Sequence, residues 1–277
     1  MDLRTLKDTP PWDWPRDAAS MFLKILRDSD VDECDRLLAA ELAGDPTVIN
    51  DQLADTLLSI ARSRDETEEL RGKAVIALGP VLEHADTAGF EDTEDILISE
   101  ETFRRIQESL RKLFLDADIP KDVRRNILEA SVRAPQDWHQ HAVSTAHSGD
   151  DESWRLTAVF CMRFIRGFDE QILAALQSKN PDIHYQAVCA AGNWSVDAAW
   201  PHIAALVASD STDKALLIAA IDAAASIRPQ EAEEILGDLI DSEDEDIAEA
   251  AFEALAMAEG PSEDEDYDEN EDDEFPG

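Results

Sequence analysis

Three histidines lie close together in the segment WHQHAVSTAH, which spans residues 138–147: His139, His141 and His147. A zinc site on a helix needs ligands on one face, typically at i and i+4, whereas side chains at i and i+2 point apart. No cysteine lies nearby in the sequence. The pattern therefore predicts no metal site. We expect Trp138 to pack at the start of a helix and the histidines to be exposed, where they could contact a partner.

Motifs that support common catalytic chemistry are missing from the sequence. There is no GxGxxG or GxxxxGK loop to hold phosphates, no GxSxG nucleophile elbow and no HExxH zinc motif. We therefore predict a protein without catalytic residues, cofactor or metal.

Two tryptophans, Trp12 and Trp14, stand in the segment PPWDWP near the N-terminus. We predict that residues 1–16 form an extended arm, because the prolines fix the backbone dihedral φ. Two large apolar side chains on such an arm must either cover one end of the folded body or bind another molecule. We favour the first alternative.

An acidic segment is followed by the most basic stretch of the chain. Residues 85–101 contain seven acids and no base, and the apolar triplet Ile96–Ile98 suggests that this insertion folds back on the body. Its other interpretation is a tolerated surface loop. Residues 104–133 then contain eight of the 24 basic residues against five acids. These bases can pair with the insertion, with an acidic tail or with an acidic partner, and we favour pairing within the chain.

Composition limits the class of protein. The 277 residues carry a net charge of −39, and residues 259–277 alone hold eleven acids and no base. Such a charge repels phosphates and anionic membrane surfaces, so we expect no nucleic-acid or membrane partner. The three cysteines are odd in number and widely spaced, which indicates small buried apolar residues in a reducing compartment. There is no secretory signal and no apolar run of about 18 residues, so we expect a cytoplasmic protein.

A ten-residue phrase recurs along the chain, of the form apolar-Arg-x-x-Ala-apolar-x-Ala-apolar-small. Its first copy reads LRGKAVIALG at Leu70–Gly79, and successive copies start 53, 31, 29, 33 and 31 residues later. The later copies are Val123–Val132, Trp154–Arg163, Ile183–Gly192, Leu216–Ala225 and Ile247–Ala256. Their apolar residues fall on one face of an α-helix, and a second amphipathic segment follows most copies. A helix pair of this kind must stack on its neighbours to bury its apolar face.

This phrase resembles the short HEAT-like repeat, the form of about 30 residues that is also seen in phycobilin lyases. The resemblance implies an all-α fold, a right-handed α-α superhelix of antiparallel helix pairs. We predict one solenoid over residues 17–258, a degenerate cap at its N-terminal end and a disordered acidic tail at 259–277. The repeat family that this phrase resembles includes a hydroxylase that holds iron through repeated His-Glu dipeptides. This chain has no His-Glu dipeptide, so we do not expect that activity.

The function predicted from these features is a protein-interaction scaffold, monomeric and without enzymatic activity, that binds a basic protein through the concave face of the solenoid. One alternative is an enzyme or enzyme subunit of the HEAT-like lyase group, and another is an acidic decoy that mimics nucleic acid. The candidate protein-binding residues are Trp12, Trp14, Trp138, His139, His141, His202, Arg104, Arg105, Arg111 and Arg125.

Overall fold

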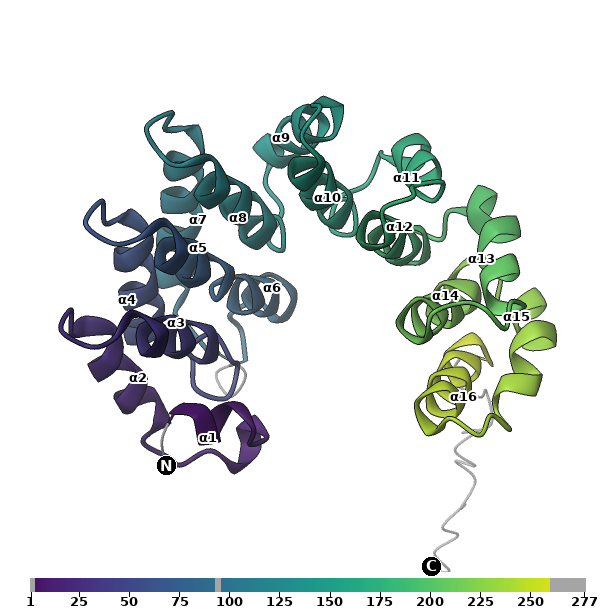
Figure 1. Ribbon diagram of the computed structural model, residues 1–277, viewed down its shortest axis with the longest axis horizontal. Coiled ribbons are helices and arrows are strands. Elements are labelled where there is room, and N and C mark those ends of the chain that lie inside the picture. Colours follow the sequence, from purple (N-terminus) through teal and green to yellow (C-terminus); the bar gives the residue numbers. More distant parts are fainter. Residues whose placement is uncertain (1–2, 93–95, 260–277) are drawn as a thin grey trace, which may run out of the picture. The chain divides into compact units, whose positions relative to one another are not determined.

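The computed structural model describes residues 3–92 and 96–259, and within those ranges every regular element is a helix (Figure 1). This confirms the predicted all-α fold class. Each copy of the phrase begins in an α-helix, and we call these the phrase helices. They are α5 (Glu68–Ile76), α8 (Lys121–Ser131), α10 (Glu152–Cys161), α12 (Pro181–Asn193), α14 (Lys214–Ile227) and α16 (Glu245–Glu259).

Contacts between Cα atoms divide the chain into two compact units, Met1–Gln171 and Ile172–Gly277. The boundary falls inside the short helix α11 (Asp169–Ala175). The sequence predicts one array over residues 17–258, and its continuity across this boundary stays a prediction.

The first unit is built from two rows of helices that pack on one another. The phrase helices α5, α8 and α10 follow one another in one row, which starts with α3 (Glu33–Leu42). Helices α2, α4 and α7 pack against this row from the other side, and α9 packs on α10. The remaining bounds in this unit are α1 (Leu3–Lys7), α2 (Ala18–Arg27), α4 (Asp51–Arg62), α6 (Gly79–Ala88), α7 (Glu100–Leu115) and α9 (Asp137–Ser148).

The second unit repeats this arrangement with shorter partners. Phrase helix α14 lies between α12 and α16 and packs on both. The helices α13 (Trp200–Val207) and α15 (Pro229–Leu236) pack on the other side of this row. A short 3-10 turn precedes α13, and another follows α15. Alanine at the inner phrase positions leaves no side chain that would hold neighbouring phrase helices apart, and Ala187, Ala220 and Ala251 are fully buried.

Helix α3 carries a seventh copy of the phrase, in the part of the chain for which the sequence predicts a degenerate cap. Asp35–Gly44 reads DRLLAAELAG, so that Arg36 and Gly44 take the places of Arg71 and Gly79. The copy opens on an acid instead of an apolar residue, so it departs from the phrase at its first position. The repeat therefore reaches further toward the N-terminus than the sequence pattern alone indicates.

The N-terminal arm is helical, and the prediction of an extended segment over residues 1–16 is wrong for the part that the structure describes. Leu3 and Leu6 are one turn apart in α1 and both are buried, so packing against the body stabilises a helix that ends before Pro10, whose ring restricts only its own φ and the residue before it. The chain then turns through the 3-10 helix Pro11–Asp13.

The described parts of the insertion, residues 85–92 and 96–101, pack on the body, as the apolar triplet predicts. Ile98 is buried, and Leu97 and Phe90 pack against the core of the first unit. The ring centroid of Phe90 lies 5.5 Å from that of Phe103 in α7. The predicted disordered tail lies outside the described residues from position 260 onward.

No helix in the described part of the chain combines the length and the apolar character needed to cross a membrane. All three cysteines are free. Cys161 is buried and Cys189 is half-buried, whereas Cys34 is exposed on the first turn of α3. The prediction that all three are buried is therefore wrong for Cys34.

Candidate functional site

A pocket of about 580 Å³ opens in the first unit where four helices meet. The last turn of α7 and the phrase helix α8 form one part of its wall, while α9 and the start of α10 form the rest. This volume lies within the usual range of small-ligand and side-chain binding sites. The lining residues are Phe114, Leu115, Arg124, Trp138, His141, Ala142, Thr145, Ala146, Gly149, Asp150, Asp151 and Trp154.

Three aromatic rings give the pocket its apolar character. The ring centroid of Phe114 lies 4.9 Å from that of Trp138 and 6.4 Å from that of Trp154. Leu115 extends the apolar wall into solvent, with 67% of its surface exposed. Trp154 opens its phrase copy, and the sequence predicts a core position for it. Instead, it is half-buried at the pocket wall, because it stands in the first turn of α10, where the row of phrase helices faces α7 and α9.

Trp138 is held in place by the turn that starts α9. Its indole Nε1 donates to Gln136 Oε1 at 2.8 Å, and its ring lies against that of His139, with centroids 3.8 Å apart. The ring therefore sits between Phe114 and His139 and is oriented before anything binds.

His139 is buried, so the prediction that it is exposed and contacts a partner is wrong. Its Nδ1 accepts from the backbone N–H of Gln136 at 2.9 Å and so closes the first turn of α9. With Nδ1 accepting, Nε2 carries the hydrogen and donates to Ser131 Oγ at 2.9 Å. Burial lowers the pKa of His139 to about 4, and the ring is neutral at physiological pH. His141, two residues on, is exposed at the pocket as predicted.

Arg124 differs from the other arginines at its phrase position. Arg71 Nε donates to the carbonyl of Ala61 at 3.1 Å, and Arg155 Nη2 donates to the carbonyl of Gly149 at 3.1 Å. In the copy at Asp35–Gly44, Arg36 Nη2 likewise donates to the carbonyl of Leu26 at 3.1 Å. Arg71 and Arg155 thus each satisfy a free carbonyl near the end of a preceding helix.

The side chain of Arg124 has no hydrogen-bond or ion-pair partner among the described residues. Its Nε is buried without an acceptor, and the side chain lines the pocket. A buried donor without a partner is energetically unfavourable. The pocket therefore offers a guanidinium that a bound molecule can satisfy.

Two carboxylates stand at the pocket, and they differ in environment. Asp151 caps α10 by accepting from the backbone N–H groups of Ser153 and Trp154, and it pairs with Lys121. The hydrogen bond from Lys121 is the main reason that the pKa of Asp151 is lowered, so this carboxylate is ionised. Asp150 is exposed and has no ion-pair partner in the described part of the chain.

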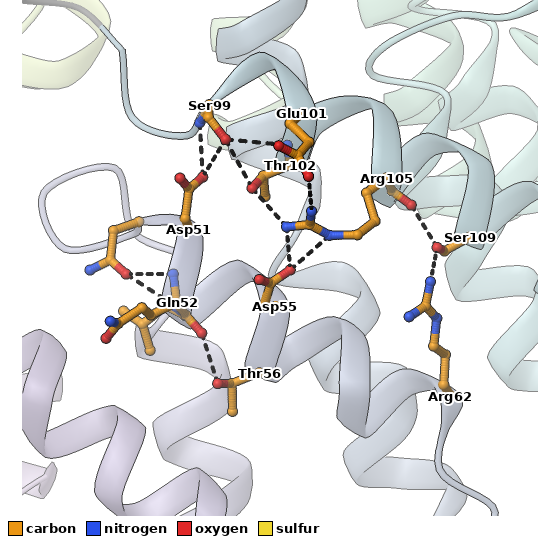
Figure 2. Close-up of polar contacts among 12 residues, drawn as sticks. Asp51, Gln52, Asp55, Thr56, Arg62, Ser99, Glu101, Thr102, Arg105 and Ser109 are labelled. Carbon is orange, nitrogen blue, oxygen red and sulfur yellow. Dashed lines mark hydrogen bonds and ion pairs between the residues drawn. The ribbon is translucent and has the colours of Figure 1, made fainter.

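Arg105 belongs to a polar network that joins α4 to α7 (Figure 2). Its Nη2 lies 2.7 Å from Asp55 Oδ1 and 2.9 Å from Thr102 Oγ1, and its Nη1 lies 3.4 Å from Glu101. The same network continues to the start of α7, where the Ser99 backbone N–H donates to Asp51 Oδ1 at 2.8 Å. Arg105 thus serves the packing of the first unit.

Of the three other predicted basic binding residues, two pair within the described part of the chain and one does not. Arg104 pairs with Glu100 of the insertion, and Arg125 donates to Thr157 Oγ1 of the next phrase helix at 3.0 Å. These pairs support the predicted internal role of the basic stretch. Arg111 is exposed and has no partner among the described residues. Its role in binding stays a prediction.

The remaining predicted residues lie away from the pocket. Trp14 packs edge-on against Phe22, with centroids 5.7 Å apart, and its Nε1 donates to the carbonyls of Leu6 and Thr9. Trp12 has 78% of its surface exposed. His202 belongs to the second unit, where it pairs with His184. The structure therefore brings Trp138 and His141 together and adds Phe114, Leu115, Arg124 and Trp154, for which no binding motif exists in the sequence.

No group of three or more histidine, cysteine, aspartate or glutamate side chains is placed to hold a metal ion within residues 3–92 and 96–259.

Comparisons with known proteins find no matching family model and no matching curated protein. Several solved structures are similar in fold. A crystal structure of Escherichia coli YibA is 14% identical with a TM-score of 0.47, covering 89% of this chain and 84% of that one. Human deoxyhypusine hydroxylase in complex with glycerol is 16% identical with a TM-score of 0.41, covering 94% and 89% of the two chains. A designed armadillo repeat protein is 16% identical with a TM-score of 0.35, covering 86% and 98%.

At these identities and TM-scores, the similarities carry no functional inference. The helical repeat architecture rests on the chain's own helix packing. Membership of the short HEAT-like family stays a prediction.

Proposed function

We propose that this chain is a protein-interaction module that binds a segment of a basic protein at the aromatic pocket of its first unit. The observation that carries the proposal is the combination of three aromatic rings with an arginine that has no partner among the described residues. An apolar side chain of the bound segment would enter the pocket, and a backbone carbonyl of the same segment would accept from Arg124.

The rings supply the apolar part of this recognition. Phe114, Trp138 and Trp154 form a pocket wide enough for one large aliphatic or aromatic side chain. Residues that insert into such pockets dominate the binding energy of protein interfaces. Because Trp138 is already fixed by Gln136 and His139, little side-chain entropy would be lost on binding.

Arg124 supplies the polar part. The three other phrase arginines that precede α12 each donate to a backbone carbonyl within the chain. Arg124 has the same chemistry and position in its repeat, yet its acceptor is missing from the described residues. A peptide carbonyl from a partner is the kind of acceptor that this position uses elsewhere.

Charge favours a basic partner. The net charge of −39 creates a field that accelerates association with cations. Asp150 at the pocket can pair with a lysine or arginine beside the inserted side chain, because its carboxylate is exposed.

The test uses two pocket variants of the full chain with a matched control. Arg124→Gln removes the guanidinium, and Thr145→Trp fills the pocket from an exposed position on its wall. Arg16→Gln makes the same charge change at an exposed arginine that does not line the pocket and is not among the candidate binding residues. Each bait is used to capture proteins from native lysate, followed by quantitative mass spectrometry and by affinity measurement with the purified partner.

We expect a partner with a basic binding segment that both pocket variants bind at least about tenfold more weakly, while Arg16→Gln binds it within about twofold of the wild type. Affinity should also fall with added salt. Equal binding by the wild type and both pocket variants would contradict the proposal.

A further inference from the structure

The last phrase helix exposes a position that is buried in all the earlier ones. The sixth residue of the phrase is apolar in every copy, and in six copies it is fully buried. These six residues are Ala40, Val75, Leu128, Val159, Val188 and Ile221. The seventh is Phe252 in α16, the largest of the set, and 64% of its surface is exposed.

The next phrase helix lies on this side of the earlier copies. Phrase helix α5 packs on α3, α8 on α5, and α14 on α12. The contact is close: a Cβ added to Gly44 would lie 2.4 Å from the carbonyl oxygen of Ala77, and one added to Gly192 would lie 2.9 Å from Cα of Ala223. No further copy of the phrase follows Ala256 in the sequence. Phe252 therefore occupies a docking position that nothing in the described part of the chain covers.

The residues around Phe252 define the chemistry of this surface. Glu249, Phe252, Glu253 and Ala256 fall at i, i+3, i+4 and i+7, which places them on one helix face, and all four are exposed. We call this set the α16 face. It presents an apolar ring between two carboxylates, neither of which has an ion-pair partner among the described residues.

An earlier repeat shows how such a face is covered inside this chain. Glu41 has the same phrase position as Glu253, and its carboxylate pairs at 3.0 Å with Lys73, which stands on the next phrase helix. Ala40, the counterpart of Phe252, is buried beside that pair. The natural complement of this face is therefore a helix that brings apolar residues and a cation.

We propose that the α16 face is a docking surface for an amphipathic helix of another protein, with a small apolar stripe against Phe252 and lysine or arginine against Glu249 and Glu253. This inference rests on the proposed function, because it assumes that the chain binds basic proteins, but it assigns a second and separate surface. The bound helix would continue the row of phrase helices in the second unit.

Charge is unfavourable for two other possible occupants of the α16 face, a second copy of the chain and the segment 260–277. A second copy of the chain would bring Glu249 and Glu253 against the same two carboxylates, and each chain has a net charge of −39. Residues 260–277 contain ten acids and no base, so they lack the cation that the face requires. The charge of Glu253 also helps to raise the pKa of Asp222, after burial, so added negative charge is unfavourable at this edge.

The probe is a fluorescein-labelled peptide of 18 residues that forms an amphipathic helix, with leucine and alanine on one face and lysine on both flanks. A second peptide replaces each lysine with glutamate. Binding to the full chain is measured by fluorescence anisotropy. The variants are Phe252→Ser, the double change Glu249→Lys with Glu253→Lys, and the control Met257→Ser.

Met257 is a suitable control because 69% of its surface is exposed, and it lies about 140° around α16 from Phe252. All of these side chains are exposed, so circular dichroism melts should match that of the wild type within a few degrees.

The lysine peptide should bind the wild type and Met257→Ser with affinities within about twofold of each other. Phe252→Ser should weaken its binding about tenfold or more, in line with the burial of one large side chain. The double lysine variant should lose the lysine peptide and gain affinity for the glutamate peptide.

Equal binding of the lysine peptide by the wild type and Phe252→Ser would overturn the proposal. So would a dimer in sedimentation velocity that Phe252→Ser converts to monomer, because a second copy would then be the occupant. Loss of the peptide in Arg124→Gln or Thr145→Trp would place the binding in the aromatic pocket and also overturn it. If lysate capture at the pocket fails while the peptide result holds, only the proposed pocket function fails.

Discussion

The imidazole rings of His184 and His202 meet with their Nε2 atoms 2.7 Å apart, which leaves room for one hydrogen between them. His202 receives a hydrogen bond at Nδ1 from the Gln177 amide at 3.4 Å, so its Nε2 carries the hydrogen and donates to His184. This pair joins α12 to α13 in the second unit. The hydrogen bond is lost once both rings are protonated, because two hydrogens would then occupy the same gap.

We predict that the contact between α12 and α13 weakens in acid. Burial lowers the pKa of both histidines, and the charge of His202 lowers that of His184 further. Because both folded-state pKa values lie below the ordinary 6.5, the unfolded chain binds more protons in acid. The stabilisation is therefore present above pH 6.5 and is lost as the pH falls below it. Hydrogen exchange of α12 and α13, corrected for intrinsic rates, should be faster at pH 5.5 than at pH 7.5.

The variant His202→Gln tests the cause of this effect, because glutamine keeps a polar side chain but does not titrate. The acid-dependent part of the exchange should shrink in α13 for this variant. An unchanged pH dependence would show that another group is responsible.

The sequence predicts the helical repeat well because the phrase is dictated by helix packing alone. Small residues are needed wherever two phrase helices cross, so alanine recurs at these positions. Asp35–Gly44 escapes the pattern because its first position is an acid, although its Arg36 and Gly44 make the contacts of the later copies.

His139 is predicted to be a structural residue of the first unit and His141 a dispensable one. His139→Ala removes the group that satisfies Gln136 N–H and leaves a cavity beside Ser131, so it should lower the free energy of unfolding by about 2–3 kcal/mol. His141→Ala should change it by less than about 0.5 kcal/mol, because the side chain is exposed. Urea unfolding followed by circular dichroism measures both.

The pH dependence of His139 has the same sign as that of the histidine pair. Its folded-state pKa of about 4 against 6.5 in the unfolded chain corresponds to about 3 kcal/mol, which is present above pH 6.5 and lost on the way to pH 4. In His139→Ala this contribution disappears. Equal stability of the two alanine variants would contradict the structural role.

The pocket is harder to predict because its parts come from four helices. Nothing in the sequence near Phe114 or Arg124 indicates that the ring and the guanidinium share a cavity with Trp154. The phrase places Arg124 in the same class as Arg71, and only the packing of α7 on α8 decides which of the two finds a carbonyl. The prediction that His139 is exposed is wrong for a similar reason. The turn at Gln136 brings the ring of His139 inward, and the sequence does not show that turn.

Arg36 is predicted to be among the most sensitive charged residues of the first unit. Its Nη1 and Nη2 donate to the two oxygens of Glu66 at 2.7 and 2.6 Å, and Nη2 also reaches the carbonyl of Leu26. Lysine cannot reproduce this fork, so Arg36→Lys should lower the free energy of unfolding by about 2 kcal/mol. The exposed Arg64, whose nearest pair is with Asp118 at 3.3 Å, is the control, and Arg64→Lys should cost less than about 0.5 kcal/mol. A similar loss in both variants would mean that the buried geometry is irrelevant.

The close approach of phrase helices predicts opposite effects for two glycines of the second unit. In Gly192→Ala the new Cβ would lie 2.9 Å from Cα and 3.0 Å from Cβ of Ala223, so α12 and α14 must separate slightly. Such overpacking costs about 1–3 kcal/mol. In Gly237→Ala the new Cβ meets nothing within 4 Å, and the residue has helical backbone angles, φ −55° and ψ −40°. That change should be neutral or should stabilise by up to about 1 kcal/mol, because alanine restricts the unfolded chain. Thermal unfolding of the two variants beside the wild type decides the matter, and the interlocked packing would be contradicted if Gly192→Ala melted at or above the temperature of Gly237→Ala.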